Sequence, residues 1–328
     1  MLSPTDIAIM SFFIFLIVVD IVGNILLVYI IILTPKQQRQ VRDIIVLNMS
    51  FADIMVGVFF FPRHVLRHAF TYPYGVTGDW LCKFVTGGNF SWVGSTASSF
   101  SVIVLAFERY FAVIYPFKQR FTLKKVKMTV IVCWLYAVIF MSPLFFVVVY
   151  SKAGNSCIED WTKESEASAF STLTLIFLLI IPVVLMAFLY GRVIRKLWFG
   201  KSQSTVRPAQ HSVIKSRKTV TKMLLIVTVV YIICWSSDLI IYMLLASSWN
   251  SKDPKYSLPE ALVLLNSAVN PIIFIVYSQR FRKQLMRILG LRRNDVSTLE
   301  GDPCHSTRKI TNQPPEEMRV ETLSSHAF

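Results

Sequence analysis

Long apolar runs separated by short polar segments define the pattern of this chain. Seven such runs lie near 7–33, 44–66, 84–112, 126–149, 168–194, 219–246 and 257–277. Each exceeds the ~20 residues that a helix needs to cross a bilayer. Continuous apolar runs of this length must be helical, because lipid cannot hydrogen-bond to the backbone. We therefore predict an all-α membrane protein, a seven-transmembrane helix bundle.

The composition agrees with this class. Of the 328 residues, 54% are hydrophobic and 16% are charged, against roughly 25% charged in soluble proteins, and the mean hydropathy is +0.54. A net charge of +15 can indicate nucleic-acid binding. Here, however, the positive residues lie between the apolar runs, so we expect a membrane protein and no nucleic-acid partner.

The distribution of Lys and Arg predicts the orientation. Segments 34–43, 109–127, 192–222 and 280–328 carry 27 of the 34 basic residues. Basic residues accumulate on the cytoplasmic side of membrane proteins. We expect an extracellular N-terminus and a cytoplasmic C-terminus in a multi-pass plasma-membrane protein. The first run is too long for the core of a cleavable signal peptide, so we expect an uncleaved signal anchor.

The segment after the seventh run is amphipathic. Residues 280–289 place Phe281, Leu285, Ile288 and Leu289 on one helical face, with basic residues around them. This pattern predicts a short eighth helix that lies along the membrane and contacts anionic lipids. We expect residues 1–290 to form one seven-transmembrane domain with helix 8. Residues 291–328 are polar and are expected to form a disordered cytoplasmic tail.

Short motifs occur in order along the predicted spans. They are Gly23-Asn24, the run 47–53 that ends at Asp53, Glu108-Arg109-Tyr110, Trp134, Pro182 with Tyr190, Cys234-Trp235, and Asn270-Pro271-Ile272-Ile273-Phe274. Over residues 7–290 this ordered set resembles the rhodopsin-like (class A) G-protein-coupled receptors, and most closely their neuropeptide group. The resemblance implies a receptor, not an enzyme, that promotes nucleotide exchange on a heterotrimeric G protein.

The resemblance also implies a switch at the cytoplasmic face. Arg109 would pair with Glu108 at rest and turn toward the fifth span on activation. Many relatives carry a second acid at the start of the sixth span, where this chain has Arg217 and Lys218. We therefore predict measurable basal signalling. The switch residues are Glu108, Arg109, Tyr110, Tyr190, Trp235, Asn270, Pro271 and Phe274.

Three positions depart from the family pattern. Ser236-Ser237 replaces the segment that usually carries a helix-kinking proline, so a kink must come from serine hydroxyls bonding back to carbonyls or from water. Phe274 stands where the family usually has Tyr. Cys82 precedes Arg109 by 27 residues, two more than is usual in the family. The third span is therefore expected to start earlier or to bulge near Gly87-Gly88. A Cys82–Cys157 disulfide is implied.

Asp53 lies near the middle of the membrane, where an isolated carboxylate is costly. In the family the matching residues surround a sodium ion or waters, and oxygen-rich clusters suit hard cations. A protonated Asp53 bonded to Asn24 and Asn270 is the alternative, and no other cofactor is expected. The network comprises Asn24, Asp53, Ser98, Asn266, Ser267 and Asn270.

The resemblance narrows the ligand. Leu264 occupies the position of the opsin lysine, which excludes a retinal Schiff base there, and Ser91 occupies that of the amine-binding aspartate. The segment from Cys157 to Trp161 resembles the acidic, aromatic hairpin rim of peptide receptors. The expected pocket residues are Arg63, Ser91, Glu159, Trp161, Asp238, Tyr242 and Glu260.

Two interpretations of Asp238 remain open. It is a counter-ion for a basic peptide group, such as an Arg near an amidated C-terminus, or Asp238 or Glu260 forms an internal salt bridge with Arg63. The expected partners are an extracellular peptide, a G protein at the loop 197–217, membrane lipids, and arrestin if the tail is phosphorylated. A small-molecule receptor is an alternative. A seven-helix ion or proton transporter is less favoured, because Glu108-Arg109 and the basic loops have no evident transport use.

Overall fold

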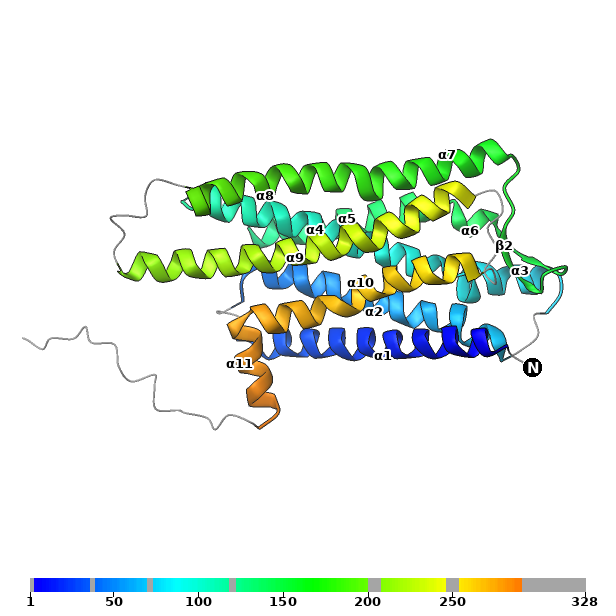
Figure 1. Ribbon diagram of the computed structural model, residues 1–328, viewed down its shortest axis with the longest axis horizontal. Helices are drawn as coiled ribbons and strands as arrows, with labels where there is room; N and C mark the ends of the chain where they lie inside the picture. Colours follow the sequence, from blue (N-terminus) through cyan, green and yellow to red (C-terminus); the bar gives the residue numbers. More distant parts are fainter. Residues whose placement is uncertain are drawn as a thin grey trace, which may run out of the picture.

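The structure is a computed structural model, and it describes residues 3–35, 39–69, 73–117, 122–199, 208–245 and 254–290. Long helical segments run side by side in a bundle, and the short helix α11 (Gln279–Ile288) lies across one end (Figure 1). In the described part, seven helical segments are long and apolar enough to cross a membrane. The predicted seven-helix bundle with an eighth helix is confirmed.

Several spans consist of more than one element. The first two are α1 (Pro4–Leu33) and α2 (Val41–His64), the latter followed by the 3-10 turn η2 (Leu66–His68). The third joins α3 (Val76–Leu81), the π-helix η3 (Cys82–Thr86) and α4 (Asn89–Ile114). The fourth is α5 (Leu123–Met141) with α6 (Leu144–Val147). The fifth joins α7 (Glu164–Leu175), the π-helix η4 (Ile176–Ile180) and α8 (Ile181–Phe199). The last two are α9 (Pro208–Leu245) and α10 (Pro254–Tyr277).

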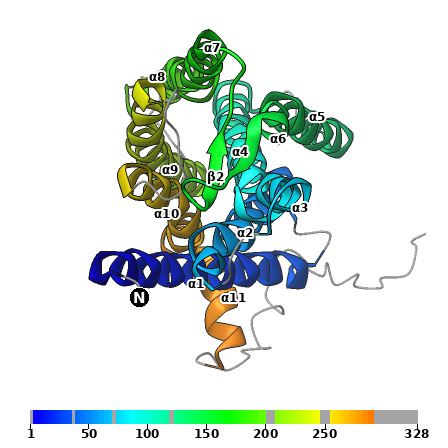
Figure 2. The same ribbon diagram turned by 90° about the vertical axis from the view of Figure 1, so that its right-hand side faces the viewer.

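A β-hairpin covers one end of the bundle. Strand β1 (Val148–Ser151) pairs antiparallel with β2 (Ser156–Glu159), in a register that sets Val148 opposite Glu159. Viewed end-on, the hairpin crosses the mouth between α9 and α4 (Figure 2). We call this the hairpin end; α11 and the last turns of α4 lie at the opposite end.

Local sequence explains where the first helix begins. The Ser3 hydroxyl accepts from the Asp6 backbone nitrogen at 3.1 Å, and the Asp6 carboxylate accepts from the Ser3 nitrogen at 3.2 Å. This reciprocal pair satisfies two backbone donors that a helix start leaves free. Pro4 follows at the first helical position, where a missing N–H costs nothing. Helix α1 therefore begins sharply at Pro4.

The bundle carries apolar residues on its outside and polar residues within. Phe15, Ile139 and Val184 are 62%, 69% and 65% exposed, whereas Asp53 and Asn270 are buried. Water would disfavour such a surface, but hydrocarbon does not, and polar groups inside a membrane protein turn toward the bundle interior. The apolar surface therefore fits a bilayer.

Close helix packing explains one motif of the sequence. A Cβ atom added to Gly23 would lie 3.2 Å from the side chain of Pro271. An alanine at 23 would therefore require Pro271 of α10 to shift by a few tenths of an ångström.

The helix of the sixth span extends well beyond its apolar core. The span was predicted near 219–246, and α9 begins at Pro208. The additional residues are polar and basic, so a hydropathy pattern cannot register that the helix continues beyond the apolar core. The predicted loop 197–217 is therefore partly helical at both ends, and residues 200–207 lie outside the described part of the chain.

Candidate functional site

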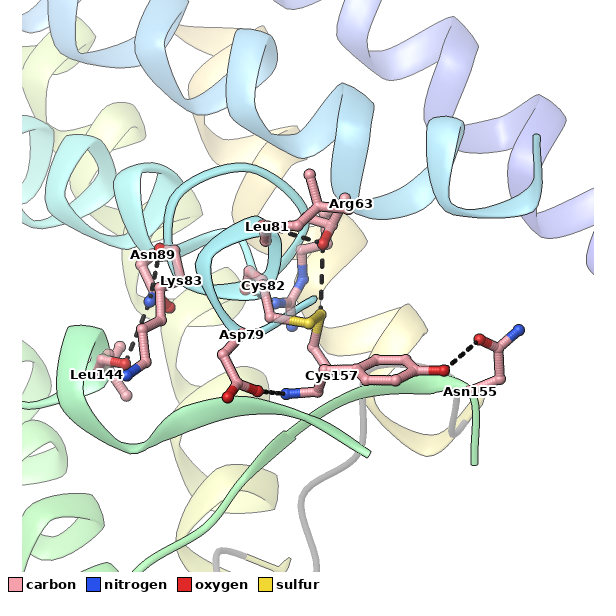
Figure 3. Close-up of a disulfide and its surroundings, with 12 residues drawn as sticks. Arg63, Asp79, Leu81, Cys82, Lys83, Asn89, Leu144, Asn155 and Cys157 are labelled. Atoms are coloured by element: carbon pink, nitrogen blue, oxygen red, sulfur yellow. Dashed lines mark hydrogen bonds between the residues drawn. A yellow bond between two sulfur atoms is a disulfide. The ribbon is translucent and has the colours of Figure 1, made fainter. Parts of the chain in front are cut away.

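A disulfide fastens the hairpin to the third span. Cys82 opens the π-helix η3 and is bonded to Cys157 of β2, as predicted (Figure 3). The backbone nitrogen of Tyr150 in β1 also donates to the Asp79 carboxylate of α3 at 2.8 Å. The hairpin is thus held at two points over the mouth of the bundle.

Two adjoining features of the third span accommodate the additional residues between Cys82 and Arg109. The π-helix η3 adds residues to its turn, and Gly88 then adopts a left-handed conformation with φ +78°. Glycine tolerates this conformation because it lacks a Cβ atom. We expected either an early helix start or a bulge near Gly87-Gly88, and the structure has both. Helical structure already begins at Val76, and the bulge lies at η3 and Gly88.

Arg63 connects three segments beneath the hairpin. Its Nε donates to Glu260 Oε2 of α10 at 3.0 Å and its Nη2 donates to Glu260 Oε1. Its Nη1 donates to the backbone carbonyl of Gly87 at the bulge. Arg63 and Glu260 are 1% and 3% exposed, and His64 Nε2 lies 2.9 Å from Glu260 Oε2. The internal salt bridge considered for Arg63 is therefore present with Glu260.

A small cavity lies below the hairpin, between α4, α7, α9 and α10. Its volume is about 40 Å³, enough for a few water molecules and too small for a ligand side chain. Trp235 is buried and lies on its wall. The lining residues are Trp92, Met141, Leu144, Glu159, Phe170, Thr174, Leu178, Trp235, Asp238, Leu239, Tyr242 and Glu260.

Glu159 closes this cavity from the hairpin side. One carboxylate oxygen accepts from Trp161 Nε1 and from the Tyr242 hydroxyl, each at 2.8 Å. Burial raises the pKa of Glu159 to about 7, although these two donors lower it. Burial disfavours the charged form of a carboxyl. The Tyr242 bond therefore ties α9 to the hairpin through a carboxyl group that titrates near neutral pH.

Asp238 is the cavity acid without a partner. Its side chain lies on the cavity wall and the residue is 7% exposed. Among the described residues, no hydrogen bond or ion pair reaches its carboxylate. Arg63 is already engaged by Glu260. A buried carboxylate without a partner is unfavourable, so this position is suited to a basic group that enters the cavity.

A polar network fills the centre of the bundle. Asn270 Nδ2 donates to Asp53 Oδ2 at 2.9 Å, and Ser98 and Ser267 face the same carboxyl. Within the described residues, Asp53 Oδ1 and Asn266 Oδ1 are buried and have no hydrogen-bond partner. Oxygen atoms left open in this way fit a hard cation.

Asn24 belongs to a neighbouring pair. Its Nδ2 donates to Asp20 Oδ1 at 2.9 Å and to the Asp20 carbonyl at 3.0 Å. The alternative arrangement had both Asn24 and Asn270 hydrogen-bonded to Asp53. In the structure, Asn270 makes this bond and Asn24 bonds to Asp20 instead.

The charged pair at the opposite end has the expected form. Arg109 donates through Nε and Nη2 to the two carboxylate oxygens of Glu108. Arg109 is 7% exposed. Lys218 of α9 lies over the ring of Trp198, 5.4 Å from its centre. Among the described residues, Glu108 is the acid that pairs with Arg109.

Three further residues of the expected switch have defined surroundings. The Tyr190 hydroxyl is buried without a hydrogen-bond partner in the described chain, and Tyr110 packs edge-on against Phe111 at 5.4 Å. Phe274 is fully buried, its ring 6.4 Å from that of Phe281 in α11. An apolar contact between α10 and α11 thus occupies the place of the usual Tyr hydroxyl.

The sixth span has serine hydroxyls in the segment where the family pattern has a helix-kinking proline. Ser236 and Ser237 both donate to the Ile233 carbonyl, at 3.1 and 3.0 Å. This is the back-bonding that we considered as a substitute for the proline.

The sequence matches the family model described as 7 transmembrane receptor (rhodopsin family) over residues 23–274, which is most of the chain. The chain belongs to the rhodopsin family of seven-transmembrane receptors. Members of this family are receptors and not enzymes, and the seven spans make this receptor a multi-pass plasma-membrane protein.

Three relatives show where the receptor stands in its family. It is 24% identical to the "QRFP-like peptide receptor" of Branchiostoma floridae, an alignment covering 89% of this chain and 80% of the relative. It is 26% identical to "Neuropeptide FF receptor 2" of Mus musculus, with 92% and 76% covered. It is 25% identical to "Galanin receptor 2b" of Danio rerio, with 88% and 76% covered.

The structure brings four of the seven expected pocket residues to the cavity of this receptor. They are Glu159, Asp238, Tyr242 and Glu260. Arg63 and Trp161 lie behind them as partners of Glu260 and Glu159. Ser91 does not line the cavity, because its hydroxyl donates to the Val56 carbonyl of α2 at 3.3 Å.

Sequence reasoning missed most of the apolar wall. Trp92, the neighbour of Ser91, lines the cavity, as do Phe170 and Leu239. Aromatic and aliphatic residues of this kind also face lipid, so their residue types alone do not place them at a cavity. For Leu239 the spacing of three residues from Tyr242 along one helix was a usable signal.

Proposed function

We propose that an extracellular peptide with a basic side chain activates this receptor, which then promotes nucleotide exchange on a heterotrimeric G protein. The relatives of this receptor, which include a peptide receptor and a neuropeptide receptor, support this proposal. The acidic cavity below the hairpin supports the basic character of the ligand.

Asp238 is the observation that carries the proposal. A guanidinium or ammonium group next to Asp238 would give this buried carboxylate the partner that it lacks. Trp92, Phe170 and Trp235 lie on the same cavity wall and offer faces for an aromatic neighbour or for the cation itself. The preferred ligand therefore carries an Arg or Lys near an aromatic residue, for instance close to an amidated C-terminus.

Ligand entry requires movement, because the cavity holds only about 40 Å³. The bond from Tyr242 to Glu159 joins α9 to the hairpin, so a group that separates them releases the outer end of α9. The same helix reaches the opposite end of the bundle (Figure 1) and contacts α4, the helix that carries the Glu108–Arg109 pair. Displacement of α9 would open the surface around Arg109 to the G protein.

The proposed orientation places the hairpin end outside the cell and α11 inside, in agreement with the distribution of basic residues. Residues 1–290 then form the receptor domain, and α11 lies on anionic lipid. The predicted disordered tail 291–328, with its sites for arrestin recruitment, lies outside the described residues.

We also propose that a sodium ion binds at Asp53 as an allosteric ligand. Asp53 Oδ1 and Asn266 Oδ1 are the open oxygens that support this site, and Ser98 and Ser267 would complete it. Sodium is expected to lower agonist affinity in the wild type and to have no effect in Asp53→Asn. A sodium effect that survives this substitution would exclude the site.

A peptide-library screen tests the function directly. Cells expressing the receptor with a promiscuous G-protein reporter are exposed to peptides in amidated and free-acid forms, beside untransfected cells and a panel of amines, lipids and nucleotides. Basic peptides are expected to give ligand-dependent loading of GTPγS. Activation by a small molecule, with all peptides silent, would refute the peptide assignment. Ionic current that follows a pH or sodium gradient without any ligand would favour a transporter.

A further inference from the structure

A groove runs along the side of the bundle, separate from the ligand cavity. It has a volume of about 440 Å³ and lies over α4, between α5 and η4 with α8; Figure 2 shows α4 set between α5 and α8. Its walls are mainly aromatic and aliphatic, and they include Phe100, Phe107 and Phe111 of α4, Tyr136 of α5 and Leu185 of α8. All of these helices belong to membrane spans, so the groove opens onto hydrocarbon.

The apolar part of the groove has the length of one lipid tail. The α4 wall begins at the polar residues Thr96 and Ser99, and its apolar part reaches from Phe100 to Phe111, which is roughly 16 Å at a rise of 1.5 Å per residue. Half of the hydrocarbon core measures about 15 Å. An acyl chain from a single leaflet therefore matches the apolar part of the groove in length.

Two basic side chains flank the end of the groove that lies away from the hairpin. Thr129 lines the groove and donates to the carbonyl of Lys125, which places Lys125 one turn further on the same face of α5. On α8, Arg192 lies two turns beyond the lining residue Leu185, and its guanidinium lies over the Phe188 ring at 5.8 Å. Both side chains are exposed, and no acidic residue in the described chain pairs with either.

We propose that this groove binds an acidic phospholipid of the cytoplasmic leaflet. One acyl chain lies along α4, and the anionic headgroup lies between Lys125 and Arg192. The assignment to the cytoplasmic leaflet depends on the orientation proposed above, whereas the existence of the lipid site does not. The cytoplasmic leaflet is the one rich in anionic lipid, so the charges and the apolar wall select the same occupant.

The lipid would contact the wall of the ligand cavity. Leu178 lines both the groove and the cavity, and Tyr231, which also lines the groove, donates its hydroxyl to the Leu178 carbonyl. The bound chain therefore packs against the link between η4 and α9.

Photolabelling of the full-length receptor in phosphatidylcholine nanodiscs tests the proposal. The probe is phosphatidylserine with a diazirine in its acyl chain, and the matched control is phosphatidylcholine with the same chain. Phosphatidylserine is expected to label peptides that contain Phe100–Phe111 and to do so more strongly than phosphatidylcholine. Ile103→Trp, which fills the groove, should abolish that labelling. Ile131→Trp, on the lipid-facing side of α5 and 52% exposed, should not.

Surface variants keep the test valid if Ile103→Trp fails to fold. Lys125→Gln and Arg192→Gln should each lower groove labelling by phosphatidylserine about fivefold, the effect of about 1 kcal/mol per basic residue at an anionic surface. Lys283→Gln, on α11, should leave it unchanged. Equal labelling by the two lipids would overturn the headgroup assignment. Labelling by a sterol diazirine that displaces phosphatidylserine, or no label in the groove, would overturn the proposal. Neither readout requires peptide or G protein, so failure of the proposed receptor function would leave this result unaffected.

Discussion

Arg63 of α2 and Glu260 of α10 form a buried ion pair at the hairpin end of the bundle. The same guanidinium donates to the Gly87 carbonyl, so one side chain fixes α2, α10 and the bulge in the third span. Because Glu260 is neutralised by Arg63 and Glu159 accepts from Trp161 and Tyr242, Asp238 is left as the cavity carboxylate without a partner among the described residues.

Removing one member of this pair should destabilise the receptor strongly. Arg63→Ala leaves Glu260 buried without its strong partner, and such losses cost about 3–5 kcal/mol. We expect a clear fall in the thermal unfolding temperature of the purified receptor. The double variant Arg63→Met with Glu260→Met should recover much of the loss, since no charge is stranded. A double variant less stable than Arg63→Ala would show that the pair itself is not the cause.

The Glu108–Arg109 pair is expected to set the basal activity. Glu108→Gln exchanges a charged acceptor for a neutral one, and charge-assisted hydrogen bonds are about twice as strong as neutral ones. Basal GTPγS loading without ligand should rise severalfold, whereas Arg109→Ala should remove it. The wild type should already exceed untransfected cells, because no second acid holds Arg109 in the described chain. Loading at the background level in both the wild type and Glu108→Gln would contradict this view.

Glu159 should make peptide potency depend on pH. Burial raises the pKa of Glu159 to about 7, so the carboxyl is mainly neutral below that pH and mainly negative above it. A cationic peptide gains an additional attraction as the pH rises through 7, and its potency should increase. Dose–response curves on either side of that pH measure the effect, and Glu159→Gln should flatten it. An equal pH dependence in Glu159→Gln would assign the effect to another group.

Much of the fold could be predicted because its signals are local. The apolar runs predict the spans, and the Cys82–Arg109 spacing predicts the bulge. Helix ends such as Pro208 could not be predicted, because a helix that leaves the membrane becomes polar. The partner of Arg63 could not be predicted either, since Asp238 and Glu260 are far apart in the chain and only the packing of α9 and α10 decides between them. Ser91 shows the same limit: the direction of its side chain depends on how α4 packs against α2.

The most direct test of the central claim is a charge cycle between Asp238 and the activating peptide. Agonist potency is measured for the Arg peptide and its neutral citrulline analogue on the wild type and on Asp238→Asn. The control variant is Asp160→Asn, which changes an exposed aspartate next to Glu159. Losing one partner of a buried charge pair costs 2 kcal/mol or more, so Asp238→Asn should weaken the Arg peptide by about thirtyfold or more. The citrulline analogue and the control variant should change little. Equal losses for both peptides, or none for either, would contradict direct pairing at Asp238.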